Sequence, residues 1–140
     1  MRVELTIEIA RPPDDVFAYL TDVEQLPRWQ KSVLEARADG PFAEGTRIVE
    51  RRSLFGREAE SELQVTAFEP GRRLTLETIR GPVELEVDHR LEQAETGTRL
   101  EVTAAGRAKG ALRFAGPAVA AGARQELKGD FERLKALLEE

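Results

Sequence analysis

One histidine stands out among the residues that could do chemistry in this sequence of 140 residues. Imidazole is the side chain whose ordinary pKa lies nearest to neutral, so His89, the only histidine, is a candidate general acid or base. The alternative is a core histidine that is hydrogen-bonded to a hydroxyl or a backbone carbonyl. Cysteine is absent, which excludes a thiolate nucleophile and Cys-ligated zinc, and a single histidine excludes any site that needs two imidazoles.

A second group of polar residues lies on predicted strands whose neighbouring positions are apolar. The group comprises Glu50, Arg52, Ser61 and Arg80. Arginine presents a planar fork of N–H donors, so these side chains could bind a carboxylate or polarise a carbonyl group of a ligand. The competing interpretation is a mutual salt-bridge network that closes one end of the sheet. The catalytic candidates are therefore His89, Glu50 and Arg80.

The first quarter of the chain predicts one strand and two short helices. Residues 3–9 alternate apolar and polar side chains, which predicts a half-buried strand. Two prolines followed by two aspartates at 12–15 predict the start of a helix, because proline suits the first helical turn and carboxylates suit the positive end of the helix dipole. Asp22, with a glutamine three residues later, predicts a second short helix through Trp29.

The rest of the chain predicts a long sheet and a closing helix. Residues 33–107 alternate with a period of two between glycine- and proline-containing breaks, which predicts six more strands. Apolar residues from Val119 to Leu138 then recur every three or four positions, as in an amphipathic helix. The predicted fold class is α+β, a curved seven-stranded antiparallel sheet wrapped around a long C-terminal helix, with two short helices between strands 1 and 2.

The predicted turns decide which side chains face the helix. If each hairpin closes with two residues, every strand pairs in one register and shows one set of side chains to the inside. In that register Glu50, Ser61 and Arg80 form a polar row, with Arg52 one step further out. Burying such ions without water would cost roughly several kcal/mol each, so we expect a hydrated, charged mouth over an apolar floor. The predicted ligand-contacting residues are Glu50, Arg52, Ser61, Leu63, Leu76, Thr78, Arg80, Leu85, Val87, His89, Val102, Ala123 and Leu127.

Composition limits the classes of partner. The 21 basic and 26 acidic residues give a formal net charge of −5, so we expect no nucleic-acid partner and no attraction to an anionic membrane surface. No apolar run is long enough for a signal peptide or a membrane span, and we expect no membrane insertion. The expectation is a single cytoplasmic domain over residues 1–140, monomeric or weakly dimeric, with no metal and no cofactor.

Several short motifs resemble one family along nearly the whole chain. They are IARP at 9–12 before VF at 16–17, LTD at 20–22, LPRW at 26–29, GTR at 45–47, FEPGRRL at 68–74, GTRL at 97–100 and LKALLE at 134–139. They are similar to the START-like superfamily, also called SRPBCC or helix-grip, and to its polyketide cyclase/dehydrase-like branch in particular. The resemblance implies an apolar cavity between the sheet and the last helix. It also implies an entrance ringed by loops that correspond here to residues 55–56, 81–82 and 106–117.

Three functions are compatible with these observations. The first is binding of a small hydrophobic or amphipathic molecule, such as a lipid, a polyketide-like or an aromatic compound, in the cavity. The second is a polyketide cyclase/aromatase or a dehydratase, in which His89 and an arginine or glutamate move protons and polarise a carbonyl. The third is a co-chaperone-like protein-interaction domain, which a filled interior and a large exposed apolar patch would favour. Whether the protein is an enzyme stays open at this point.

Overall fold

The chain builds one sheet and a few helices, and the computed structural model describes residues 1–54, 56–108 and 116–140. Seven antiparallel strands, two short α-helices after the first strand and a long C-terminal helix confirm the predicted α+β helix-grip class. No helix in the described ranges is long and apolar enough to cross a bilayer. The elements are β1 (Arg2–Ile9), α1 (Pro13–Leu20), the 3-10 turn η1 (Val23–Gln25), α2 (Leu26–Trp29), β2 (Val33–Ala38), β3 (Arg47–Leu54), β4 (Arg57–Glu69), β5 (Arg73–Arg80), β6 (Val83–Ala94), β7 (Gly97–Ala108) and α3 (Gly116–Leu138).

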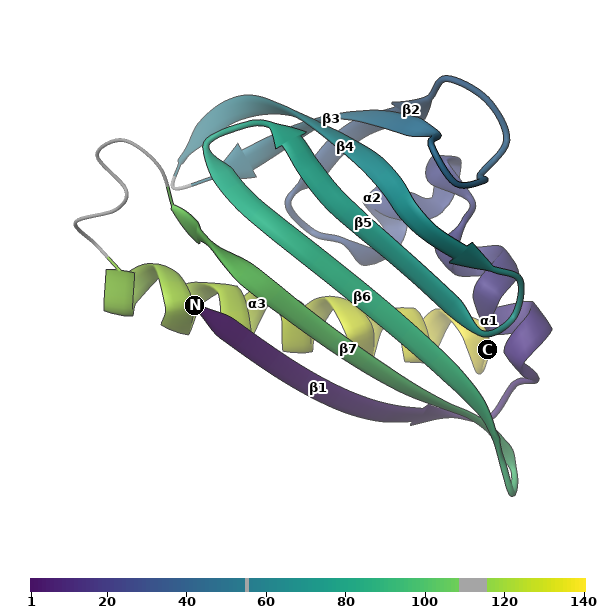
Figure 1. Ribbon diagram of the computed structural model, residues 1–140. Helices are drawn as coiled ribbons and strands as arrows, with labels where there is room; N and C mark the ends of the chain where they lie inside the picture. The colour runs from purple at the N-terminus through teal and green to yellow at the C-terminus, as the bar shows by residue number, and fades with distance from the viewer. Residues whose placement is uncertain (55, 109–115) are drawn as a thin grey trace.

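The strand order is β1-β7-β6-β5-β4-β3-β2, and every neighbouring pair is antiparallel. The sheet therefore places the first strand beside the last one and leaves β1 and β2 at its two edges. Figure 1 shows the sheet curving across α3, with α1 and α2 on the same side of the sheet as α3. The three α-helices thus cover a single face of the sheet. The volume of the side chains between that face and α3 decides whether a cavity remains there.

The short helices begin where the sequence predicts. Pro13 is the first residue of α1, and Asp14 and Asp15 occupy its first turn, where the helix dipole favours negative charge. Asp22 caps η1 by accepting a hydrogen bond from the backbone N–H of Glu24 at 3.2 Å. α2 follows η1 directly and carries Trp29, which is buried.

The predicted hairpin registers are confirmed over most of the sheet. Leu76 pairs with Val87 and Glu50 pairs with Ser61, as two-residue turns require. Gly71 has a φ of +73° in the β4–β5 turn, a conformation that glycine adopts without steric cost. Two β-bulges interrupt the β4–β5 pairing, and one of them changes the predicted site, as described below.

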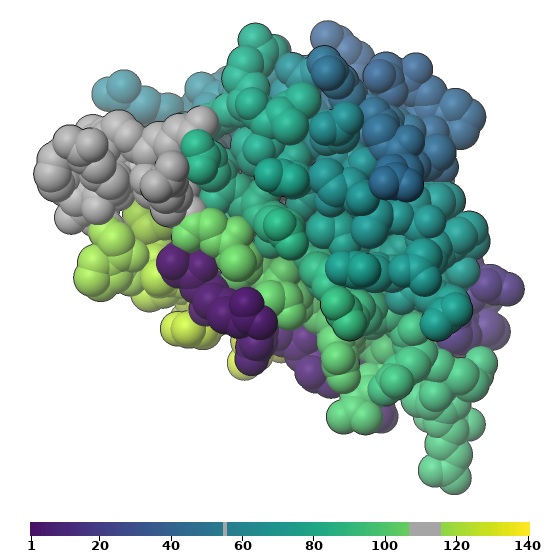
Figure 2. Space-filling view, in the orientation of Figure 1, coloured from purple at the N-terminus to yellow at the C-terminus, as the bar shows by residue number. Residues whose placement is uncertain are grey.

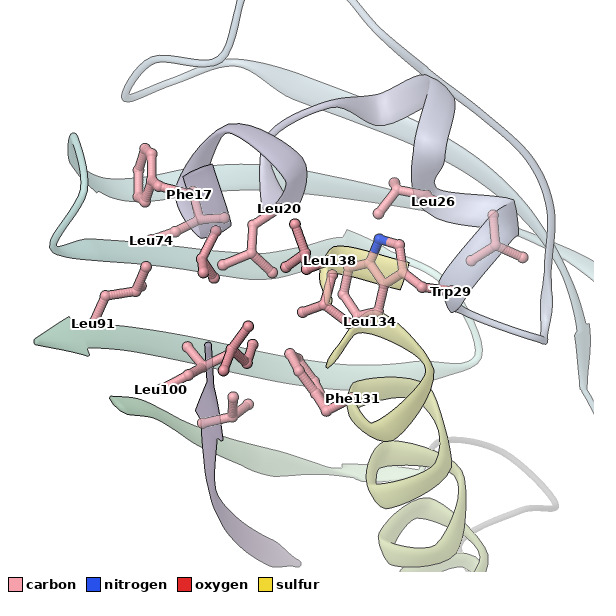
Figure 3. Close-up of a cluster of buried hydrophobic side chains, with 14 of the residues drawn as sticks. Phe17, Leu20, Leu26, Trp29, Leu74, Leu91, Leu100, Phe131, Leu134 and Leu138 are labelled. Atoms are coloured by element: carbon pink, nitrogen blue, oxygen red, sulfur yellow. The ribbon is translucent and has the colours of Figure 1, made fainter. Parts of the chain in front are cut away.

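A hydrophobic core fills one end of the space between the sheet and the helices. Figure 3 shows Phe17 and Leu20 from α1, Trp29 from α2 and Leu134 from α3 converging over the sheet. Trp29 packs edge-to-face on Phe131, with ring centroids 5.1 Å apart. Because these large side chains meet near the C-terminal end of α3, that end of the space is closed.

The opposite end of the molecule carries the predicted entrance loops. The β3–β4 hairpin, the β5–β6 hairpin and the start of α3 lie at this same end (Figure 1). Residue 55 and residues 109–115, at which two of the entrance loops are predicted, lie outside the described residues. Side chains of β4 to β7 cover the outer face of the sheet (Figure 2). On these strands Asp88 forms ion pairs with Arg73 at 3.0 Å and with Arg90 at 2.9 Å.

Candidate ligand-binding cavity

A cavity of about 310 Å³ lies between the sheet and the first part of α3. This volume is at the lower end of the range of roughly 300–1,000 Å³ that is usual for small-molecule sites. Most of its lining is apolar, and includes Leu63, Leu76, Leu85 and Val87 from the sheet and Leu127 from α3. The interior is therefore suited to an apolar molecule of modest size.

The sizes of the side chains along α3 explain where the cavity lies. Val119, Gly122 and Ala123 face the sheet near the start of the helix and line the cavity. Further along the same face of α3, the larger side chains of Phe131 and Leu134 are buried in the core. Positions three and four apart share a face of a helix, so a change from small to large residues along that face leaves space at one end and fills the other.

A buried ion pair forms part of the cavity wall. Arg52 on β3 donates from Nε to Glu50 Oε2 at 2.6 Å, and Glu50 is only 2% exposed. The Arg52 guanidinium also donates from Nη1 to Ser32 Oγ at 2.9 Å and from Nη2 to Gln30 Oε1 at 2.7 Å. These bonds join β3 to the segment between α2 and β2 and fix the guanidinium on the wall.

Two further carboxyl groups reach the cavity from α3. Glu126 and Asp130 are one helical turn apart, and both line the cavity. Both carboxyl groups lie close enough to Arg52 to stabilise its positive charge electrostatically. Asp130 Oδ1 accepts hydrogen bonds from the backbone N–H of Lys31 at 3.2 Å and from Arg133 Nη2 at 3.1 Å. Burial and the neighbouring Glu126 raise the pKa of Asp130 to about 6.

His89 lies deep in the cavity wall and is 4% exposed. Its Nδ1 is 2.9 Å from the carbonyl oxygen of Leu74, so Nδ1 carries the proton and donates it to that carbonyl. Its ring also lies 5.8 Å from the ring of Phe131. Burial lowers the pKa of His89 below its ordinary value, so the ring is neutral near pH 7 and presents Nε2 as an acceptor. The expected core histidine bonded to a backbone carbonyl is confirmed, and the same residue also lines the cavity.

Comparison with known proteins places this geometry in a family. Residues 1–139 match the family model described as polyketide cyclase/dehydrase and lipid transport. The chain belongs to this family. No curated protein matches the sequence.

Solved structures share the fold of this polyketide cyclase/dehydrase family member. A START superfamily protein from Mycobacterium smegmatis superposes with a TM-score of 0.84 at 16% identity, covering 99% of this chain and 97% of that one. The Zhui aromatase/cyclase from a Streptomyces species has a TM-score of 0.84 at 17% identity, covering 99% and 93%. The family match and this likeness show a START-like, or SRPBCC, fold, as the sequence motifs indicate.

Most of the residues predicted to contact a ligand do line the cavity of this family member. They come from β3 to β6 and from α3, and two predicted residues, Arg80 and Val102, do not line it. The lining members of the predicted set are Glu50, Arg52, Ser61, Leu63, Leu76, Thr78, Leu85, Val87, His89, Ala123 and Leu127.

The predicted inward orientation of Arg80 is wrong. A β-bulge at Glu62/Leu63 shifts the end of β5 by one residue, so Arg80 pairs with Glu62 instead of Ser61. A shift of one residue turns a side chain to the other face of a sheet. The Arg80 side chain is 66% exposed and contacts Glu60 at 3.1 Å and Glu62 at 3.7 Å on the outer face. It therefore belongs neither to the polar row nor to a catalytic group.

Val102 faces the inside but lies in the filled part of the core. It pairs with His89, as the register predicts, and is 1% exposed among the core residues. The reason is its position along the sheet. Beyond His89 on β6, Leu91 packs in the core, whereas Val87 and Leu85 on the other side of His89 line the cavity.

Sequence reasoning missed four polar residues of the wall, namely Gln30, Ser53, Glu126 and Asp130. Gln30 follows the short helix α2 and gave no periodic signal, because its role depends on the position of Arg52. Glu126 and Asp130 immediately precede Leu127 and Phe131 in the apolar stripe of α3, a flanking position that could have indicated partial burial. Asp130 is only 6% exposed, although it lies in a run of charged residues on α3.

Titration of Asp130 should make stability depend on pH near 6. The pKa of this carboxyl is about 6 in the folded protein against an ordinary value of 3.8, so between these values the folded state holds a proton that the unfolded chain has lost. Protonation of Asp130 therefore favours folding increasingly as the pH falls from 7 towards 4. Relative to an Asp130→Asn variant, the unsubstituted protein should gain about 1 kcal/mol of unfolding free energy between pH 7 and pH 5. Urea unfolding of both proteins at both pH values measures this gain. The prediction is contradicted if the difference in unfolding free energy between the two proteins stays constant or falls from pH 7 to pH 5.

Proposed function

We propose that this protein binds a small hydrophobic or amphipathic molecule in the cavity between the sheet and α3. The observation that carries the proposal is a cavity of about 310 Å³ whose walls are mainly apolar, with one group of charged residues around Arg52. Transferring apolar surface out of water contributes roughly 25 cal/mol per Å², so an acyl chain or an aromatic skeleton would gain most of its affinity from these walls. Lipid-like, polyketide-like and aromatic compounds are the classes that fit.

A cyclase or dehydratase activity is the second candidate, and one observation supports it. His89 lines the cavity and its Nδ1 is bonded to the carbonyl of Leu74, so Nε2 is the ring nitrogen that could take a proton from a bound molecule. Burial lowers the pKa of His89, which weakens it as a base, and no other titratable side chain is hydrogen-bonded to it among the described residues. These facts favour binding over proton transfer.

A co-chaperone-like interaction domain receives less support. It would be favoured by a filled interior and a broad apolar surface. The interior instead holds the cavity, and in the described part of the chain the exposed large hydrophobic side chains are Leu34 on β2 and Ile79 on β5. Those two strands are separated in the sheet by β3 and β4, so the two residues form no patch.

The test uses Trp29, which is the only tryptophan of the sequence and lines the cavity. Titration with apolar probes, among them a neutral naphthylamine dye and medium-chain lipids, should change the Trp29 emission and saturate with a Kd on the order of micromolar. Native mass spectrometry should show one bound molecule per chain, and the probe should be recovered with its mass unchanged. No saturation with any probe would refute the proposal, and recovery of a dehydrated or cyclised product would identify an enzyme instead.

A further inference from the structure

The polar atoms on the cavity wall are unequally occupied. The main donor, Arg52, is engaged with Glu50, Ser32 and Gln30. Several acceptors are not engaged. Among the described residues, Glu126 makes no hydrogen bond, although it lines the cavity. Trp29 also lines the cavity, and its indole Nε1 is a buried donor without a partner among the described residues. With that one exception, the unengaged polar groups of the lining residues accept hydrogen bonds.

Two more acceptors on the same wall reinforce this pattern. The hydrogen bonds of Asp130 within the described ranges all use Oδ1, which leaves Oδ2 available. His89 is 4% exposed and lines the cavity, and its proton is committed to the carbonyl of Leu74, so Nε2 can only accept. A ligand that donates hydrogen bonds would pair with these acceptors, which have no partner among the described residues.

The charges point in the same direction. Among the described residues that line the cavity, three carry carboxyl groups, namely Glu50, Glu126 and Asp130, and two carry cations, namely the Arg52 guanidinium and the Met1 ammonium, which donates to the carbonyl of Gly106. Arg52 uses three of its five N–H donors in the bonds named above, so a ligand carboxylate would have to share a guanidinium that is already paired with Glu50 at 2.6 Å, and it would enter beside Glu126. A protonated amine carries three donors and no acceptor, and it would meet complementary charge on α3.

We propose that the cavity selects apolar molecules whose polar end is a hydrogen-bond donor, above all a protonated amine, and discriminates against carboxylates such as fatty acids. This inference rests on the proposed binding function and specifies its ligand class. The amine would lie between Glu126 and Asp130, with the apolar part of the molecule along Leu127 and the sheet. With a pKa of about 6, Asp130 is ionised above pH 7 and adds to the attraction there.

Three probes with one chain length and different head groups test the inference. Decylamine, decanol and decanoate, each below its critical micelle concentration, are titrated at pH 7.5 while the Trp29 emission is recorded. We expect decylamine to bind at least about tenfold more tightly than decanoate, with decanol in between. Because the alkyl chain has the same length in all three probes, the order of their affinities reports the effect of the head group alone.

A matched pair of variants on α3 locates the effect. Glu126→Gln removes a charge from the cavity wall without removing a hydrogen bond among the described residues, so folding should be preserved. It should weaken decylamine binding about three- to tenfold and strengthen decanoate binding. Glu132 is exposed on the same helix, so Glu132→Gln makes the same change of net charge outside the cavity and should leave both affinities unchanged.

The outcomes separate this inference from the proposed function. Decanoate binding as tightly as decylamine would overturn the selectivity and leave the binding function intact. Equal effects of the two variants would also overturn it, because the attraction would then come from the net charge of the protein. Failure of all three probes and of the neutral dye to bind would overturn the binding function itself.

Discussion

Replacing Ala123 by phenylalanine is expected to abolish ligand binding without destabilising the protein. Ala123 lies on α3 and lines the cavity, so a phenyl ring at this position would occupy a large part of the 310 Å³ that a ligand needs. The affinity for the tightest probe should fall at least about thirtyfold, which corresponds to about 2 kcal/mol. Filling an apolar cavity commonly adds about 0.5–2 kcal/mol of stability, so the unfolding free energy should stay the same or rise.

The opposite responses of binding and stability make this result specific. Ala121 lies two residues earlier on the same helix and is exposed, so Ala121→Phe adds the same side chain outside the cavity. Fluorescence titration and urea unfolding of both variants give the comparison, and Ala121→Phe should bind as the parent does. Normal affinity in Ala123→Phe would mean that ligands bind elsewhere. Lost affinity together with lost stability would mean that the ring disrupts α3 packing rather than filling free space.

The fold and most of the cavity lining could be predicted because hairpin turns fix the register of a sheet. Once the turn between β5 and β6 is placed, Leu76 must lie beside Val87 and both must face α3. The same rule places Glu50 beside Ser61 on the inside of β3 and β4. Local sequence is sufficient for such pairs, since each depends on a single turn and a period of two.

The errors arise where distant residues decide the outcome. Arg80 turns outward because of a bulge, and β5 itself contains no glycine or proline that marks the irregularity. Gly81 and Pro82 follow Arg80 and indicate only the turn. Val102 is correctly placed on the inner face, but whether that face is filled or open depends on the sizes of Phe131 and Leu134, which reach it from another element. Burial of Asp130 likewise depends on how α3 sits against α2 and β3.

Replacing Arg52 by leucine is expected to lower the unfolding free energy by about 3 kcal/mol. Glu50 is 2% exposed, and its carboxylate accepts from Arg52 at 2.6 Å. Removing the guanidinium would leave that charge buried without a cation, a change that typically costs about 3–5 kcal/mol. The lower end applies because the Arg52 side chain keeps 22% of its exposure. Urea unfolding measures the loss. Arg51→Leu, on the outer face of the same strand, should leave the unfolding free energy nearly unchanged, because the Arg51 ion pairs are exposed to solvent.

A double variant shows whether the cost comes from the unpaired carboxylate. If it does, removing both charges in Glu50→Leu/Arg52→Leu should destabilise the protein less than Arg52→Leu alone, because two apolar side chains need no partner. The double variant should also bind decanol more tightly than the parent, since its wall is more apolar. A loss in the double variant equal to the sum of the two single losses would contradict this account. The stability would then derive from the bonds of Arg52 to Ser32 and Gln30, which hold the segment after α2 against β3.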